Sequence, residues 1–282
     1  MIPRLTLVGL GLLGGSVAKA ARAEGLAREI VAVGRRRESL EPAWKDGAVD
    51  HITTNVAEGV RDCDLCILAT PVATLASLLH DVWRAAPPTA LLTDVGSTKA
   101  AIARTADALH RERPLAFIGS HPMAGSDRSG YHVSRGDLFK GALVILTPTP
   151  TSSLPALERV REFWQALGAR VTTLDPATHD RAVAAISHLP HLVADALVET
   201  VLRMDPRFLD VAAGGFRDTT RIAASNPTVW REIFQENREA LGEALATFRR
   251  ALDDLDRLVG SKDVPAIEGE LDRIKRARER LS

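Results

Sequence analysis

Short apolar runs alternate with amphipathic stretches over the first 173 residues of the chain. An apolar run bounded by Gly or Pro is typical of a buried strand, and apolar positions three and four apart are typical of a helix. Strands are predicted at residues 4–11, 29–34, 64–71, 89–97, 115–122, 142–148 and 169–176. Helices are predicted at residues 12–25, 37–47, 72–86, 98–112 and 154–168. This alternation predicts an α/β fold whose doubly wound, mostly parallel sheet has helices on both faces.

The pattern changes after Asp175, where strand-like runs give way to long helical periodicity. The segments that follow are rich in Ala, Leu, Glu and Arg, and their apolar positions recur at three and four. These segments are residues 178–204, 226–260 and 263–282. We therefore expect two domains, an α/β domain over residues 1–173 and an all-helical domain over residues 174–282.

The charge of the chain limits which ligands it can attract. The 282 residues include 36 basic and 36 acidic side chains, so the formal net charge is +0. A neutral chain has no bulk field that would draw it to nucleic acid or to an anionic membrane. An acidic ligand would therefore have to be held by a few local basic groups. With 45% apolar and 26% charged residues, we expect a substantial core and a soluble protein.

The sequence favours a cytoplasmic location. No apolar run approaches the length of a membrane span, and the amino-terminal residues begin a strand rather than a signal peptide. Cys63 and Cys66 have the C-x-x-C spacing of redox motifs, but they lie in an apolar run that ends in proline. We expect both cysteines to be small buried hydrophobic residues.

A glycine motif lies between the first predicted strand and the first predicted helix. Gly9, Gly11 and Gly14 have the G-x-G-x-x-G spacing of Rossmann-type dinucleotide-binding domains. The first glycine permits a tight turn, the second lets the backbone approach a pyrophosphate, and the third allows close strand–helix packing. The helix amino terminus, with Leu12 and Leu13, offers unpaired N–H donors to the phosphates. We therefore predict a dinucleotide site in the first domain.

Charge at the end of the second predicted strand bears on which dinucleotide binds. NAD sites usually have an acidic residue there, which accepts hydrogen bonds from the ribose hydroxyls. Here that position falls at about Gly34, and Arg35, Arg36 and Arg37 follow it. Because guanidinium groups bind phosphate, the pattern favours NADP over NAD, although a solvated basic turn has the same composition. Arg35 and Arg36 are the predicted cofactor contacts.

A histidine and a serine lie at the carboxyl ends of two neighbouring predicted strands. His121 lies in GSHPMAGSDRSG, and Ser97 lies in TDVGSTK. Both positions fall at the carboxyl edge of a parallel sheet, where ligands of open α/β sheets bind. A neutral imidazole beside a hydroxyl suits removal of a proton from an alcohol as its carbon gives up hydride. A capping role in the following helix explains Ser97 equally well, so both roles stay open.

The helical part contains two further polar clusters. His188 and His191 are three residues apart in SHLPH, and because no third ligand is suitably spaced, we expect no metal site. Arg217, Asp218 and Arg221 lie in GGFRDTTR at spacings that allow ion pairs on one helical face. An arginine fork also matches a carboxylate ligand, so this cluster suits either a structural ion pair or a substrate clamp.

Six segments, in their order along the chain, resemble the prephenate/arogenate dehydrogenase family of tyrosine biosynthesis. They are VGLGLLGGS, DVGSTK, GSHPMAGSDRSG, SHLPH, GGFRDTTRIA and NPTVWREIFQEN. The resemblance extends from Leu7 to about Asn237, and the histidine and arginine segments are more specific than the glycine motif. It implies a dinucleotide-binding domain followed by a helical dimerisation domain, and therefore a homodimer.

The resemblance also implies a reaction. Members of this family oxidatively decarboxylate prephenate or arogenate: hydride leaves C4 of the cyclohexadienol for NAD or NADP, and the ring loses CO₂ and becomes aromatic. By this resemblance, His121 takes the proton of the C4 hydroxyl, and Ser97 orients that hydroxyl and the imidazole.

The remaining site residues are assigned by the same resemblance. His191 would contact the substrate, and Arg221 would clamp one of its carboxylates. Asp127 and Asp218 would form a charged gate with Arg221, and Asp127 stands where some relatives have glutamate. Trp230 would reach the site of the neighbouring subunit.

Two other interpretations share part of the pattern. Another two-domain dehydrogenase or reductase, such as a β-hydroxyacid dehydrogenase, has the glycine motif but does not call for His121 together with Arg221. A non-catalytic nucleotide-binding protein would not need these residues intact.

The sequence does not distinguish prephenate from arogenate, which differ by a keto or an amino group. We expect neither a fused chorismate mutase nor a carboxyl-terminal regulatory module, so any control by tyrosine would act at the active site.

Overall fold

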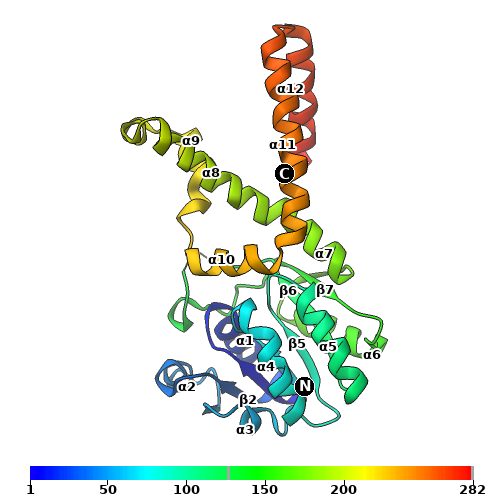
Figure 1. The fold of residues 1–282 in the computed structure, drawn as a ribbon. Helices are drawn as coiled ribbons and strands as arrows, with labels where there is room; N and C mark the ends of the chain where they lie inside the picture. Colours follow the sequence, from blue (N-terminus) through cyan, green and yellow to red (C-terminus); the bar gives the residue numbers. More distant parts are fainter. Residues whose placement is uncertain (126–127, 281–282) are drawn as a thin grey trace.

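A computed structural model of the chain describes residues 1–125 and 128–280 (Figure 1). Its first part contains one eight-stranded sheet in the order β3-β2-β1-β4-β5-β6-β7-β8. The strands are β1 (Ile2–Val8), β2 (Ala27–Val33), β3 (His51–Thr53), β4 (Leu65–Leu68), β5 (Leu91–Asp94), β6 (Ala116–Pro122), β7 (Leu143–Thr147) and β8 (Arg170–Thr173). Neighbouring strands from β3 to β6 are parallel, β7 is antiparallel to β6, and β8 is parallel to β7. The predicted mostly parallel α/β sheet is confirmed.

The helices of this part connect the strands and cover the sheet. They are α1 (Leu12–Ala23), η1 (Arg37–Ser39), α2 (Glu41–Lys45), α3 (Val56–Val60), α4 (Val72–Ala85), α5 (Ala100–Glu112), η2 (Tyr131–Val133) and α6 (Leu154–Ala166). The sequence did not predict β3 and α3, because three and five residues are too few to show a period. The helix predicted over residues 37–47 is divided into η1 and α2.

Alternation along the strands divides the apolar side chains between the two faces of the sheet. On β4, Leu65 and Ile67 join the cluster that α1 and α6 cover, whereas Cys66 and Leu68 join the cluster under α4 and α5. A strand buried on both faces needs apolar residues at successive positions, which is why these strands appear as continuous apolar runs. Cys63 and Cys66 are free and buried in the second cluster, so their predicted role as small hydrophobic residues is confirmed.

The chain beyond β8 is helical, as predicted. Its elements are α7 (Pro176–Val183), the π-helical turn η3 (Ala184–His188), α8 (Leu189–Met204), η4 (Pro206–Val211), α9 (Gly214–Thr220), η5 (Arg221–Ala224), α10 (Pro227–Glu236), α11 (Arg238–Ser261) and α12 (Val264–Glu279). Helices α8 and α9 form one projecting arm, and α11 and α12 form a long hairpin (Figure 1).

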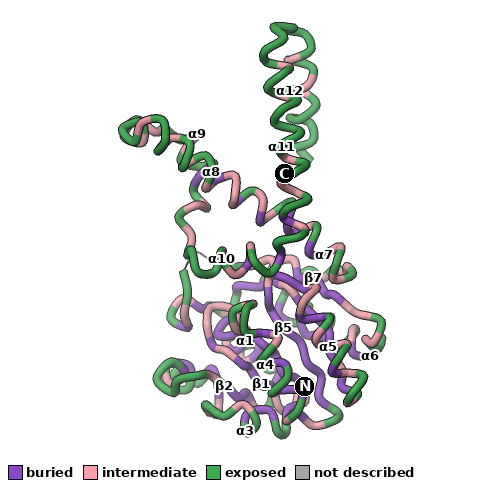
Figure 2. Tube along the Cα trace, viewed as in Figure 1, coloured by how far each residue is buried: buried purple, intermediate pink, exposed green. Residues whose placement is uncertain are grey.

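Much of the arm and the hairpin is exposed in the single chain, as the green and pink parts of the tube show (Figure 2). Large apolar side chains are among the exposed residues. They include Leu197, Leu202, Met204, Phe208, Val259 and Leu271. An extensive exposed apolar surface favours association with another protein surface, and most of the exposed large apolar side chains in the described part of the chain belong to the helical domain.

Residues Pro176–Met204 form the single helix, within residues 1–125 and 128–280, that is long and apolar enough to cross a membrane by length and composition. The sequence predicted no segment of that kind. The difference arises because η3 joins α7 and α8 into one helix of 29 residues. Asp180 in this helix accepts hydrogen bonds from the backbone N–H groups of Lys99 and Ala100, so its first turns pack against the α/β domain.

Trp164 provides a test of the sheet core. Its buried ring packs edge-to-face against Phe139 and Phe163, and its Nε1 donates to the Ser120 hydroxyl at 3.1 Å. We expect Trp164→Ala to lower the free energy of unfolding by about 3–5 kcal/mol, because the neighbours cannot fill the cavity. Urea unfolding followed by circular dichroism, at one protein concentration, measures the loss. Trp44→Ala on α2 is the matched control, because Trp44 is 49% exposed; an equal loss in both variants would contradict the prediction.

Candidate active site

Strands β5 and β6 end side by side and carry the predicted serine and histidine. The strands are parallel, with Thr93 opposite Ile118, so the residues that follow them lie at the same edge. Ser97 follows β5 and is partly exposed; no side-chain hydrogen bond to it occurs within residues 1–125 and 128–280. His121 lies within the strand predicted over residues 115–122, and it is a strand residue in the structure, because the end of β6 pairs with β7 and places Ile145 opposite His121. Two strands therefore fix the backbone of His121.

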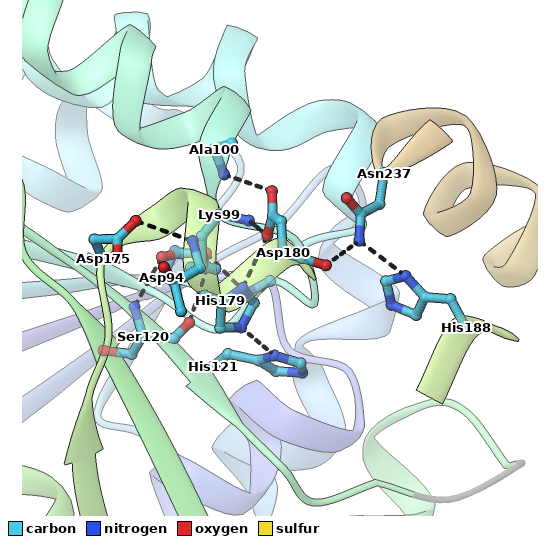
Figure 3. A network of polar contacts seen from close by, with 12 residues as sticks. Asp94, Lys99, Ala100, Ser120, His121, Asp175, His179, Asp180, His188 and Asn237 are labelled. Atoms are coloured by element: carbon cyan, nitrogen blue, oxygen red, sulfur yellow. Dashed lines mark hydrogen bonds and ion pairs between the residues drawn. The ribbon is translucent and has the colours of Figure 1, made fainter. Parts of the chain in front are cut away.

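The imidazole of His121 meets a second imidazole. Its Nδ1 lies 2.9 Å from Nε2 of His179 in α7, and the two rings are edge-to-face with centroids 5.1 Å apart (Figure 3). Burial holds the pKa of His121 well below its usual range, and the positive charge of the nearby Lys99 ammonium lowers that pKa further. His121 is therefore a neutral imidazole near pH 7, and as a whole residue it is partly exposed at the edge of the sheet.

Asp180 follows His179 in the chain and connects α7 to α5. Its carboxylate accepts hydrogen bonds from the backbone N–H groups of Lys99 at 2.8 Å and Ala100 at 2.9 Å, and it contacts Nδ1 of His179 at 2.8 Å. Burial raises the pKa of Asp180, but these hydrogen bonds outweigh burial and leave the pKa below its usual value. Asp180 therefore caps α5 as a carboxylate. The alternative role of Ser97 as the cap of this helix is wrong.

A buried ion pair lies under the same strand ends. The ammonium group of Lys99 contacts the carboxylate of Asp94 and donates to the carbonyl oxygen of Ser120 at 2.9 Å. Asp94 also accepts hydrogen bonds from the backbone N–H groups of Gly96 at 2.8 Å and Ser120 at 3.1 Å. Burial lowers the pKa of Lys99, and the charge of Asp94 opposes that shift. The pair ties the end of β5 to the residue just before His121.

His188, the last residue of η3, continues the polar network away from the sheet. The Asn237 amide donates to the carbonyl oxygen of Asp180 at 2.8 Å and lies 3.1 Å from Nδ1 of His188. Burial lowers the pKa of His188 to about 4, against the opposing charge of Asp180. His188 is therefore neutral at pH 7, and the network joins α7, η3 and the start of α11 (Figure 3).

His191 lies one turn beyond His188 and is 3% exposed. Its ring stacks on Trp230 of the same chain, with centroids 3.5 Å apart and an angle of 15° between the planes. Nε2 of His191 lies 3.8 Å from the Asp195 carboxylate, whereas the buried Nδ1 has no hydrogen-bond partner among the described residues. Burial lowers the pKa of His191, and Asp195 opposes the shift. An unpartnered buried nitrogen is costly, so it marks a place where a ligand atom would be favourable.

The predicted arginine cluster is not part of this network. Arg217 and Asp218 are in α9 and Arg221 begins η5; all three are exposed and lie on or next to the projecting arm (Figure 1). Within the described part of the chain, no ion pair forms among them, so the predicted intrahelical pair is absent there. Asp127 lies outside the described residues. The structure thus brings His121 close to the end of β5 but does not join it to Arg221.

The turn between β1 and α1 has the shape that a dinucleotide phosphate requires. Gly9 has a φ of +100°, and a Cβ on Gly14 would lie 2.1 Å from the carbonyl oxygen of Gly9, so neither position accepts another side chain. Gly11 faces open space and precedes α1 without a side-chain cap, which leaves the first N–H groups of α1, at Leu12 and Leu13, free for an anion. These residues suit the phosphates of a dinucleotide.

Four polar residues of the site escaped the reasoning from sequence: Asp94, Lys99, His179 and Asp180. They meet across separations of up to 81 residues, which no periodicity reveals. The tripeptide THD at the start of α7 was the available signal, since a His–Asp pair within an apolar helix must find buried partners.

Two family descriptions match the chain. "Prephenate dehydrogenase, nucleotide-binding domain" matches residues 17–173, and "Prephenate dehydrogenase, dimerization domain" matches residues 175–273. The projecting arm and most of the hairpin belong to the second match. Their exposed apolar side chains are therefore part of a dimerisation domain.

Individual relatives agree with these matches. A prephenate dehydrogenase of Bacillus subtilis is 34% identical over 263 residues, which cover 92% of this chain and 71% of that protein. Prephenate dehydrogenase from A. aeolicus, in complex with hydroxyphenyl propionate and NAD+, has a TM-score of 0.93 at 32% identity and covers 100% of this chain and 99% of its own. Synechocystis arogenate dehydrogenase has a TM-score of 0.88 at 32% identity, with 99% and 100% covered. On this evidence, the chain belongs to the prephenate/arogenate dehydrogenase family.

Proposed function

We propose that His121 is the base with which this prephenate/arogenate dehydrogenase oxidises its substrate in tyrosine biosynthesis. One observation carries the proposal. His121 is a neutral imidazole at the carboxyl edge of the sheet, and only one of its two ring nitrogens contacts another described side chain. Nδ1 of His121 contacts His179, whereas its Nε2 has no hydrogen-bond partner within residues 1–125 and 128–280. A neutral imidazole held in this way can accept a proton without first losing one.

The reaction needs a base because an alcohol becomes a ketone. A nicotinamide held at the glycine turn would supply the hydride acceptor for C4 of the cyclohexadienol, and Nε2 of His121 would take the proton of the C4 hydroxyl. The electron pair freed by loss of CO₂ then makes the ring aromatic and gives a phenolate, to which His121 returns the proton. Ser97, at the neighbouring strand end, would orient the hydroxyl by a hydrogen bond.

The helical part would hold the rest of the substrate. His191 would contact the substrate, and Arg221 would bind a carboxylate with its exposed guanidinium. Asp127 and Asp218 would line the entrance with Arg221, and Trp230 would face the substrate site of a second subunit. Because Asp218 and Arg221 belong to the projecting region, they would act once that region is packed in the homodimer.

The cofactor is a nicotinamide dinucleotide, and we favour NADP. Gly34 follows β2 without an acidic side chain, and Arg35 and Arg36 beyond it are exposed and free to approach a 2′-phosphate. We propose either prephenate or arogenate as the substrate.

The two free cysteines support a cytoplasmic location, where thiols stay reduced.

Replacement of His121 tests its role. We expect the wild-type protein to reduce NAD or NADP with prephenate or arogenate. His121→Asn should lower kcat by about 10²–10⁴-fold, because the base is lost, with dinucleotide affinity unchanged. Absorbance of the reduced cofactor measures turnover, and titration of protein fluorescence measures affinity. His51→Asn, on exposed β3, is the matched control; wild-type kcat in His121→Asn would exclude this base.

The lowered pKa of His121 predicts the acid limb of the activity. The imidazole must be neutral to accept a proton, so kcat/KM falls only as pH drops below the pKa of His121 in the folded protein. That pKa is well below 6.5, and we expect kcat/KM to be level from neutral pH down through 6.5 and to fall below it. A pH profile of kcat/KM, with stability checked at each pH, measures this. An acid limb centred at or above 6.5 would show that another group, or a charged His121, controls the reaction.

Arg35 tests the cofactor preference. Arg35→Asp should raise KM for NADP and lower it for NAD, because an acidic side chain repels a 2′-phosphate and accepts hydrogen bonds from a free ribose hydroxyl. The ratio of kcat/KM for the two cofactors should shift towards NAD by at least about tenfold, the equivalent of one charged hydrogen bond. Arg28→Asp, on an exposed position of β2 before the turn, is the control. An unchanged ratio in Arg35→Asp would defeat the NADP assignment.

A further inference from the structure

We propose that His179 and Asp180 determine which nitrogen of His121 carries the proton, so that Nε2 of His121 is the free base. The inference rests on the proposed role of His121 and adds a positioning residue to it. His179 is fully buried and contacts the ring of His121, so it acts through His121 and not on the substrate directly. The relay Asp180–His179–His121 is defined by two contacts, 2.8 Å and 2.9 Å long (Figure 3).

The hydrogen bonds of this relay have a defined donor and acceptor at each step, because the Asp180 carboxylate can only accept hydrogen bonds. Its carboxylate is ionised, since the hydrogen bonds it receives outweigh its burial and keep its pKa low. Nδ1 of His179 must therefore donate to Oδ1 of Asp180. A neutral His179 with its proton on Nδ1 has a bare Nε2, which is an acceptor.

The second contact follows from the first. The bare Nε2 of His179 accepts a hydrogen bond from Nδ1–H of His121, because a contact of 2.9 Å between two unprotonated nitrogens would be repulsive. A neutral imidazole has one proton, so Nε2 of His121 is left with its lone pair. Asp180 thus selects the tautomer of His121, although the imidazole ring of His179 lies between the two residues.

The opposite arrangement would need a doubly protonated His179 that donates to both neighbours. Asp180 does not need an imidazolium to balance its charge, because it already receives two backbone N–H groups at the positive end of α5. The Lys99 ammonium is buried in the same cluster, and a second buried cation there would be unfavourable. The other titratable neighbours are Asp94, which pairs with Lys99, and His188, which is neutral at pH 7.

The relay also makes the base depend on how the two parts of the chain meet. His179 and Asp180 belong to the helical part, whereas His121 belongs to the sheet. The carboxylate that sets the tautomer is the one that caps α5, so α7 must be docked on α5 for His121 to present Nε2. A loosened contact would leave a folded sheet with an imidazole free to take either tautomer.

The first test measures tautomers in the resting protein. Protein labelled with ¹⁵N in histidine is examined by long-range ¹H–¹⁵N correlation at neutral pH, with His121→Asn and His179→Asn used to assign the signals. We expect both histidines to carry their proton on Nδ1, with Nε2 unprotonated. A proton on Nε2 of His121, or a doubly protonated His179, would overturn the proposal. No substrate is needed, so this result stands even if neither prephenate nor arogenate is turned over.

The second test compares two amides at position 179. Gln can place its amide oxygen near the former Nε2 and accept from His121, whereas Asn reaches only the former Nδ1 and contacts Asp180 alone. We expect His179→Asn to lower kcat by about 10²-fold, with KM for substrate and cofactor within about twofold, because the base is misoriented rather than the substrate unbound. His179→Gln should recover at least about a tenth of wild-type kcat. His51→Asn again serves as the control.

The outcomes separate positioning from structural support. A merely structural role would lower the unfolding midpoint in both variants and leave the tautomer of His121 and the acid limb of kcat unchanged. Equal loss of kcat in Gln and Asn variants, with the Nδ1–H tautomer of His121 intact in both, would overturn the proposal. Loss of that tautomer in His179→Asn, and its retention in His179→Gln, would support it.

Discussion

The carboxylate of Asp180 is the contact on which the arrangement of the site depends. It accepts the backbone N–H groups at the start of α5, which would otherwise be unpaired, and its neighbour His179 reaches the end of β6. Its own carbonyl oxygen accepts from Asn237, at the junction of α10 and α11. One residue therefore connects the strand that bears His121, the helix after Ser97 and the helices of the dimerisation domain.

The Lys99–Asp94 pair adds order rather than net stability. Both side chains are fully buried, and removing two charges from water costs several kcal/mol per ion, which their attraction repays only with good hydrogen bonding. Here the hydrogen bonds are present, because Gly96 and Ser120 provide N–H groups and the Ser120 carbonyl accepts from Lys99. The pair fixes the spacing of two adjacent strand ends and holds the backbone of Ser120, the residue before His121.

Local patterns in the sequence were sufficient for the sheet, the change to helices and the glycine turn. Each of these features depends on residues that are close together in the sequence. Successive side chains of β4 are buried on opposite faces of the sheet, apolar residues recur with the helical period in α11, and Gly14 lies against Gly9 in the tight turn. One of the two roles left open for Ser97 was the cap of α5, but the acceptor at the start of that helix is the Asp180 carboxylate, which lies about 80 residues away in the sequence. The relay through His179 joins positions 58 residues apart, and only the packed fold shows it. Arg221 was grouped with His121 by resemblance, whereas in the structure it begins η5 and is exposed next to the projecting arm.

The wide turn η3 has a consequence for the evolution of this domain. A π-turn holds one residue more than an α-helical turn, and each residue of a helix rotates the side chains by about 100°. His179 and Asp180 precede this turn, whereas His188 and His191 end it and follow it, so its extra residue sets the angular phase between the two pairs. Point substitutions within η3 would preserve that phase, but loss of a single codon there would turn His188 and His191 away from His179 and Asp180. The length of this helix is therefore more constrained than its composition.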